Sequence, residues 1–103
     1  MNEPTVTIFE LHGRLVCDVA AISDWEGFEK LGAYIEKHHG GHIVEKLDGP
    51  DMRVWKIDVG GCVIVVEHDD PYGNSIKSTT LEGDPVVRRI FEDLQKRLTA
   101  QGA

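Results

Sequence analysis

Chemically active side chains follow directly after the most apolar run of the chain, in the segment HDDPYGNSI at residues 68–76. His68 has the chemistry of a general base, Asp69 and Asp70 that of paired carboxylates, and Tyr72 that of a general acid. The histidine and the two aspartates could also bind a catalytic metal ion, as in a metal-dependent hydrolase. Acid–base catalysis requires groups that face one another across a pocket, whereas adjacent residues of an extended chain point to opposite sides. The spacing is therefore unfavourable for catalysis.

The same segment matches a turn. Asp70, Pro71 and Gly73 occupy positions i, i+1 and i+3 of a type I turn, and Asn74 belongs to a residue type that tolerates unusual backbone dihedrals. We therefore interpret the segment as the acidic end of one strand, a proline-containing turn and the start of another strand. In this interpretation Asp69, Asp70 and Tyr72 lie at an exposed hairpin end, available to a basic partner.

Three histidines, His38, His39 and His42, lie close together near an expected helix end. A metal site needs three or four ligands that converge at fixed distances, and HHxxH at a helix terminus does not place three imidazoles on one side. Histidines after a helix more often remain in solvent and complement the negative end of the helix dipole. The sequence favours this second interpretation, and it leaves metal binding by these histidines open.

Other catalytic signatures do not occur in the sequence. No GxxxxGK or GxGxxG motif follows a strand, and there is no GxSxG nucleophile motif. Cys17 and Cys62 each lie inside an apolar strand-like run and outside any CxxC or CxxH pair, which predicts two reduced core cysteines. The sequence thus predicts a protein without catalytic residues and without a cofactor.

Length and composition predict one globular domain over residues 1–103. Hydrophobic residues make up 41% of the chain and charged residues 28%, as in ordinary soluble domains. No apolar stretch approaches the roughly 20 residues that a membrane-spanning helix needs. The N-terminal segment lacks the basic start and the apolar core of a secretory signal, so we expect a cytoplasmic protein with no membrane partner.

The formal net charge of −7 argues against a nucleic-acid partner, because phosphate binding requires clustered Lys and Arg. Adjacent bases occur at residues 88–89 and 96–97, where acids one helical turn away can neutralise them. Residues 58–70 contain four acids and no Lys or Arg. This acidic stretch predicts a basic partner.

The first half of the chain predicts two strands, a helix and a third strand. Apolar residues alternate in TVTIFELHGRLVCDVA, with a tight turn at His12-Gly13. In the following helix, Ser23 and Glu26 match a capping box and a glycine pair ends the element. The third strand covers about residues 42–47. The apolar stripe expected on the helix consists of Trp25, Phe28, Leu31 and Ile35.

The second half predicts three strands and a helix. Residues 52–59 alternate between apolar and polar side chains, which predicts a strand with one buried face. Residues 62–68 are mostly β-branched, which predicts a central strand covered on both faces. Residues 75–81 form a weaker strand, expected near an edge of the sheet. The last helix has Asp84 as its N-cap and Pro85 at its first position.

The resulting order, β-β-α-β-β-β-β-α, predicts an α+β fold. Short connections between successive strands favour a mainly antiparallel sheet of about six strands, with two amphipathic helices on one face. Two helices leave the other face open, and Val63 and Val65 would point to it. A homodimer through the uncovered face is one way to cover these side chains.

A longer pattern extends over residues 48–76. Gly49-Pro50-Asp51 precedes Arg53 and Trp55, and a glycine turn, an apolar strand and an acidic turn with Tyr72 follow. This pattern resembles a small bacterial domain family of unknown function and about this length. The resemblance implies a bacterial α+β protein with no assigned catalytic residues. The architecture is also similar to that of small acidic immunity proteins, which neutralise toxins.

Asp51, Arg53 and Trp55 occupy alternate positions and therefore share one face of their strand. If the helices cover this face, Asp51 and Arg53 form a partly buried ion pair with a structural role. If the face is open, the three residues form a patch of the type found at binding hot spots. The sequence favours the structural role. The alternative is a binding surface with the candidate members Asp51, Arg53, Trp55, Asp69, Asp70, Tyr72 and Asn74.

These observations lead us to expect a non-enzymatic protein-binding module of an immunity or regulatory type with a basic protein partner. A homodimeric structural or housekeeping domain is the alternative, and a metal-dependent hydrolase that uses His68, Asp69 and Asp70 is less well supported. The acidic surface of the binding module would comprise Asp58, Glu67, Asp69, Asp70, Glu82 and Asp84.

Overall fold

The computed structural model describes residues 6–69 and 73–102. Within these residues the chain forms one six-stranded antiparallel sheet, two α-helices and one short 3₁₀ turn, which confirms the α+β fold and the expected element order. The elements are β1 (Thr7–Leu11), β2 (Arg14–Val19), α1 (Trp25–His38), β3 (Gly41–Asp48), β4 (Met52–Val59), β5 (Cys62–Asp69), β6 (Gly73–Ser78), the 3₁₀ turn η1 (Leu81–Gly83) and α2 (Asp84–Gly102).

The strands lie in the order β1-β2-β6-β5-β4-β3, and every neighbouring pair is antiparallel. The prediction of an edge strand at residues 75–81 is wrong, because β6 lies inside the sheet between β2 and β5. The β1–β2 hairpin pairs with β6 through residues that include Cys17, which faces Ile76. Both side chains are fully buried, so this pairing extends the apolar layer beneath the helices.

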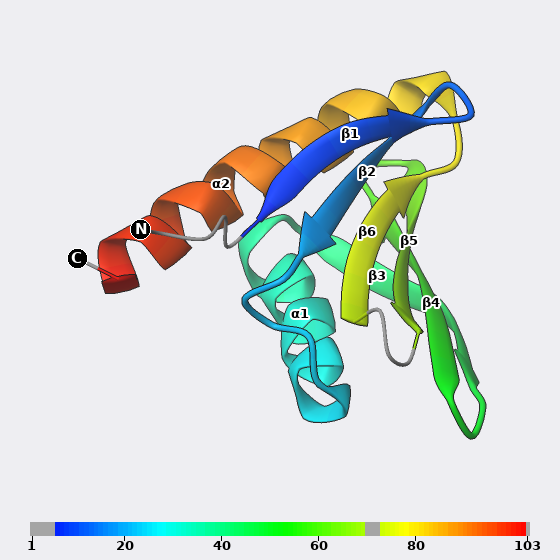
Figure 1. Cartoon of the computed structure of the whole chain (residues 1–103). Coiled ribbons are helices and arrows are strands. Elements are labelled where there is room, and N and C mark those ends of the chain that lie inside the picture. Colours follow the sequence, from blue (N-terminus) through cyan, green and yellow to red (C-terminus); the bar gives the residue numbers. More distant parts are fainter. Residues whose placement is uncertain (1–5, 70–72, 103) are drawn as a thin grey trace.

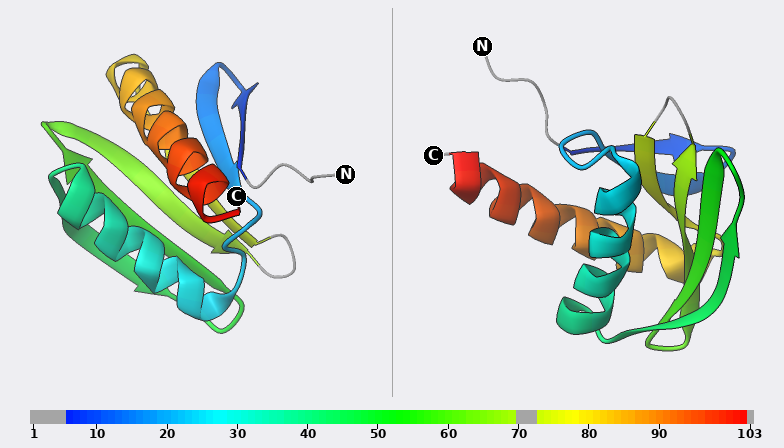
Figure 2. Two further views of the ribbon diagram at one scale, coloured as in Figure 1. Left: turned by 90° about the vertical axis from the view of Figure 1, so that its left-hand side faces the viewer. Right: turned by 90° about the horizontal axis from the view of Figure 1, so that it is seen from below.

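Both helices cover the same face of the sheet, as expected from their amphipathic patterns (Figures 1 and 2). Among residues 6–69 and 73–102 no helix lies on the opposite face, so within this part of the chain helices cover only one face of the central strand β5. Val63 and Val65 on that face are half-buried. The core between the sheet and the helices includes Val19, Phe28, Leu31, Ile35, Ile57, Ile64, Val66, Val87 and Ile90.

The helix ends differ from the sequence prediction. The N-cap of α1 is Asp24, whose Oδ1 accepts the Gly27 N–H at 2.9 Å, so the capping box of Ser23 and Glu26 does not form. Trp25 then becomes the first helical residue and is 40% exposed, although its spacing predicted a core position. Asp84 accepts hydrogen bonds from the Leu15 N–H at 3.2 Å and from the Ser78 hydroxyl. It therefore joins α2 to β2 and β6.

The tight turns follow the glycine positions. His12 and Gly13 have φ values of 52° and 79°, and Gly60 and Gly61 have values of 61° and 92°. Positive φ at both central residues is typical of the two-residue hairpin whose twist matches that of its strands. The turn expected at Asp70-Pro71 lies outside the described residues.

Both cysteines are free thiols, in agreement with the sequence prediction, although Cys62 is only half-buried. Burial, and then the charge of Asp18, raise the pKa of the Cys17 thiol to about 12. Within the described ranges, no helix is long and apolar enough to cross a membrane.

Candidate functional site

The residues of the predicted binding surface do not form one exposed patch. Arg53, Trp55 and Asn74 are buried beneath the helices, which corrects the hypothesis that they form part of an open surface. Asp51 and Asp69 are exposed. The two remaining candidates, at positions 70 and 72, lie outside the described residues.

Arg53 has a structural position under the start of α1. Its Nε donates to Asp48 Oδ1 at 2.9 Å, and its terminal nitrogens donate to Glu29 Oε2 at 3.0 Å and to the Trp25 carbonyl oxygen at 3.3 Å. The expected partner was Asp51. Asp48 takes that place because it lies directly opposite Arg53 in the β3–β4 pairing.

Aromatic rings enclose the same guanidinium group. Its central carbon lies 4.8 to 5.1 Å from the ring centroids of Trp25, Phe28 and Trp55. The Trp55 indole N–H also donates to Asp48 Oδ1, at 2.9 Å. Hydrogen bonds from Arg53 and Trp55 hold the pKa of Asp48 below its ordinary value. The arrangement joins the β3–β4 hairpin to α1 and leaves the guanidinium little access to a ligand.

His68, the predicted general base, is also buried. Its Nδ1 lies 2.7 Å from Asn74 Oδ1, so Nδ1 carries the proton in this pair, because an amide oxygen only accepts. The Asn74 amide nitrogen donates to the carbonyl oxygens of Ile22 at 2.7 Å and Asp24 at 3.2 Å. Asp69 lies on the other side of β5, as strand alternation requires. His68 and Asp69 therefore do not face one another, and the other two residues of the expected acid–base group, Asp70 and Tyr72, lie outside the described residues.

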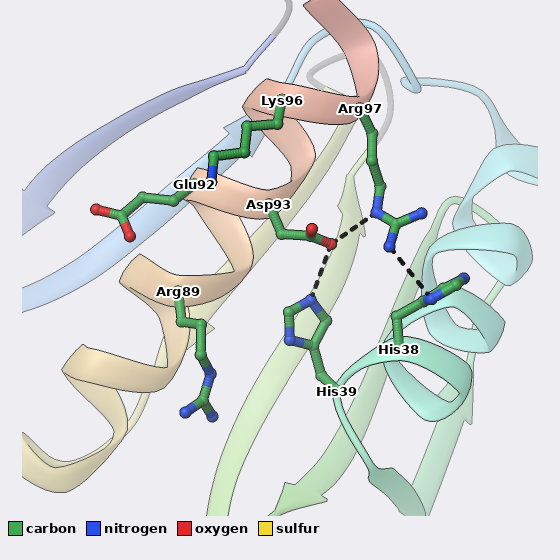
Figure 3. A pocket seen from close by; sticks show the side chains of 7 residues that line it. All are labelled: His38, His39, Arg89, Glu92, Asp93, Lys96 and Arg97. Carbon is green, nitrogen blue, oxygen red and sulfur yellow. Dashed lines mark hydrogen bonds and ion pairs between the residues drawn. The ribbon is translucent and has the colours of Figure 1, made fainter. Parts of the chain in front are cut away.

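A second group of polar residues lies between the helices and was missed by the sequence analysis, apart from two of its histidines. A cleft of about 560 Å³, which we call the interhelical cleft, opens there. His38 and His39 contribute from the end of α1 (Figure 3). The residues contributed by α2 are Arg89, Glu92, Asp93, Lys96 and Arg97.

A hydrogen-bond network joins α1 to α2 at the edge of this cleft. Asp93 Oδ2 accepts from the Tyr34 hydroxyl at 2.5 Å and from Arg97 Nε at 2.7 Å, and His39 Nε2 lies 3.3 Å away. The same His39 nitrogen is 2.8 Å from the Tyr34 oxygen. Since Tyr34 gives its single proton to the carboxylate, His39 Nε2 must be the donor to the phenol oxygen.

The surroundings of this network raise the pKa of Tyr34 and lower the pKa values of His39 and Asp93. Burial and the adjacent Asp93 carboxylate raise the pKa of Tyr34 well above its usual value, so the phenol stays protonated. Burial lowers the pKa of His39, whose side chain is only 7% exposed, although Asp93 opposes that change. The expectation of solvent-exposed histidines is thus wrong for His39. Burial acts to raise the pKa of Asp93, but hydrogen bonds from Tyr34 and Arg97 outweigh it and the pKa is lowered.

The groups that the cleft offers to a ligand are mainly the side-chain nitrogens of His, Arg and Lys. Arg97 also lies 3.2 Å from His38 Nδ1 through a terminal nitrogen, so that imidazole nitrogen accepts a hydrogen bond. Among residues 6–69 and 73–102, no group of three His, Cys, Asp or Glu side chains is arranged to hold a metal ion. A signal for the cleft does exist in the sequence: Arg89, Asp93 and Arg97 are spaced four apart on one side of α2.

The open sheet face carries a second depression, of about 190 Å³, which we call the open-face groove. Phe9 and Leu11 border it from β1 and are 47% and 46% exposed. Its remaining lining is Val16, Asp18, Glu67, Asp69, Gly73, Ser75 and Lys77. One of the predicted surface residues, Asp69, therefore belongs to a groove with both apolar and acidic walls.

Comparisons of this chain with protein-family models, with curated proteins and with solved structures give no match. The resemblance over residues 48–76 to a bacterial domain family stays a prediction.

Proposed function

We propose that this protein is a non-enzymatic binding module that holds a basic, partly apolar segment of another protein against its open sheet face. The observation that carries the proposal is the open-face groove, where exposed apolar side chains lie beside carboxylates. A role of this kind suits an immunity or regulatory protein whose partner is basic.

The apolar part of the groove supplies contact area. Phe9 lies opposite Val16 in the β1–β2 pairing, and Val16 is buried although neither α1 nor α2 covers this face. Phe9 and Leu11 remain about half exposed above it. Large exposed apolar side chains that lie together on a sheet face often mark an interaction site, whereas single exposed ones do not.

The acidic part selects the charge of the partner. Asp18, Glu67 and Asp69 line the groove, and Lys77 is the one base among its described lining residues. Lys77 Nζ is paired with Glu67 Oε1 at 3.0 Å. Two carboxylates therefore keep uncompensated charge within the described lining, on a chain whose net charge is −7. Complementary charge accelerates encounter and excludes acidic partners.

The homodimer is the alternative use of this face. A two-fold dimer places the same surface of each copy against the other. If the groove lay at the axis, Asp18 and Asp69 would meet their own counterparts, and like charges at an interface cost free energy. We therefore favour a different, basic chain as the partner.

A labelled peptide provides the test. An eight-residue peptide of alternating lysine and leucine should bind the wild-type protein at low salt, and one of alternating glutamate and leucine should not. Asp18→Asn combined with Asp69→Asn should weaken binding at least tenfold. The matched control is Asp51→Asn combined with Glu82→Gln, which removes two exposed acids outside the groove.

Equal weakening by the two double variants would show that net charge alone attracts the peptide and would contradict the proposal. Sedimentation velocity at high micromolar concentration separates the alternative. A monomer agrees with the proposed function, whereas a dimer abolished by Phe9→Ser would assign the face to self-association.

A further inference from the structure

The interhelical cleft gathers cationic groups on a chain that is acidic overall. Its three cations are Arg89, Lys96 and Arg97 of α2, and His38 and His39 at the end of α1 add imidazole groups. Such a concentration opposes the net charge of −7. Two carboxylates, Glu92 and Asp93, line the same cleft and offset part of this charge.

The two acids of the cleft do not fully cancel these charges. Asp93 is paired with Arg97 and accepts the Tyr34 hydroxyl, so its charge is already compensated. Glu92 extends away from His39 (Figure 3). Within the described residues, Arg89 and Lys96 enter no ion pair. Glu92 also enters no ion pair within these residues, so three cations and two carboxylates leave the cleft lining with a net charge of +1.

We propose that the interhelical cleft binds a phosphate group, either of a phosphate monoester or of free phosphate. Arg89 supplies a planar guanidinium, whose paired N–H groups match the oxygens of phosphate. Lys96 supplies a point charge two helical turns further along the same side of α2. Phosphate presents more acceptor oxygens to these two donors than a carboxylate does.

The network at the edge of the cleft prepares this site. Tyr34 and Asp93 hold Arg97 in place, with Nε directed at the carboxylate and the guanidinium carbon 5.5 Å from the Tyr34 ring centroid. Arg97, which also donates from a terminal nitrogen to His38 Nδ1 at 3.2 Å, is thereby held in one orientation at the cleft. The negative end of the α1 dipole opposes an anion, but Lys37 in the last turn offsets it.

The site differs from the open-face groove in every residue and in the charge of its ligand. The two proposals can therefore fail independently. A protein could bind a basic segment on the sheet and leave the cleft empty, or the reverse.

Titration with inorganic phosphate tests the inference directly. The full chain is titrated at constant ionic strength, with sodium chloride replaced stepwise, and arginine Nε–H and histidine side-chain signals are followed by NMR. We expect saturable shifts of the Arg89, Arg97 and His39 signals with a dissociation constant on the order of 1 mM. Glycerol phosphate should bind at least as well if the natural ligand is a monoester, whereas acetate should bind at least tenfold more weakly.

Variants of matched charge make the result specific. Arg89→Gln combined with Lys96→Gln should weaken phosphate binding at least tenfold. Arg88→Gln combined with Lys30→Gln removes the same charge from exposed positions outside the cleft and should leave binding unchanged. Circular dichroism confirms that all variants fold. Shifts that do not saturate, equal effects of the two double variants, or acetate binding equal to phosphate would each overturn the proposal.

Discussion

Arg53 Nε lies 2.9 Å from Asp48 Oδ1, directly across the β3–β4 hairpin. The contact places a buried guanidinium between three aromatic rings and a carboxylate that is itself partly exposed. It also connects the hairpin to Glu29 of α1. A single side chain thereby fixes how the helix lies on this half of the sheet.

Replacing Arg53 should be among the most damaging single substitutions at a polar position. Arg53→Ala removes the hydrogen bonds to Asp48 and Glu29 and empties the space between the rings, so we expect a loss of about 2–4 kcal/mol in the free energy of unfolding. Arg53→Lys should recover less than half of this loss, because an ammonium cannot donate in the same fork geometry. Urea denaturation measures both. Arg88→Ala, at an exposed position, should change stability by less than about 0.5 kcal/mol.

Asn74 should be nearly as sensitive, although it was considered as a surface residue from the sequence. Asn74→Ala leaves His68 Nδ1 and the carbonyl oxygens of Ile22 and Asp24 without their partner. Buried polar groups without partners cost about 1–3 kcal/mol each, and partial relaxation should limit the total loss to about 2–4 kcal/mol. Thermal and urea unfolding provide the measurement. Ser75→Ala, on the half-buried opposite side of β6, serves as the control, and equal losses would contradict a special role for Asn74.

Gly32 separates two opposing effects of alanine in a helix. Alanine is favoured over glycine in a helix interior by about 1 kcal/mol. A Cβ at position 32 would lie 2.8 Å from the Trp55 ring, however, and overpacking costs about 1–3 kcal/mol. We expect Gly32→Ala to be destabilising in urea titrations. At exposed Ala33 the reverse change, Ala33→Gly, should cost about 1 kcal/mol through helix propensity alone. A stabilised Gly32→Ala variant would show that Trp55 moves aside freely.

The order of the elements could be predicted because the spacing of apolar residues, alternate in strands and every three or four residues in helices, is a local property of the sequence. The place of β6 in the sheet could not be predicted from such spacing. It depends on the pairing of Cys17 with Ile76 across the chain that forms α1, β3, β4 and β5 between them. How strongly a segment favours a strand says little about which other strands that segment pairs with.

The polar sites could also be predicted only where they depend on local spacing. Arg53 and Trp55 were recognised as a pair on one strand face, but strand alternation alone suggested Asp51 as the partner, and the hairpin register selected Asp48. The Tyr34–Asp93 hydrogen bond joins residues 59 positions apart. Its formation depends on how the two helices cross, which no local spacing encodes.

Tyr34 should make the protein sensitive to alkaline pH. The pKa of its phenol is raised above the ordinary 10.0 in the folded state, first by burial and then by its hydrogen bond to Asp93. The unfolded chain therefore releases this proton near pH 10 while the folded chain keeps it, so stability is lost as pH rises above that value. Tyr34→Phe should cost about 0.5–1.5 kcal/mol at neutral pH, through the lost hydrogen bond. The difference between the two melting temperatures should narrow between pH 10 and 11, and a constant difference would contradict the shift.

His39 should lower the stability of the protein as the pH falls. Burial lowers its pKa below the ordinary value of 6.5, although the nearby Asp93 favours the charged form. As pH falls through about 6.5, the unfolded chain gains a proton that the folded chain does not take up, so the free energy of unfolding decreases. The carboxylates with lowered pKa values, Asp48, Asp84 and Asp93, titrate below the interval from pH 7 to 5. His39→Gln keeps an N–H donor for the Tyr34 oxygen but cannot titrate, so its unfolding free energy should fall less steeply over this interval. His42→Gln, at an exposed position of β3, should retain the wild-type slope. Identical slopes for wild type and His39→Gln in urea titrations at pH 7, 6 and 5 would contradict the burial of a neutral imidazole between the helices.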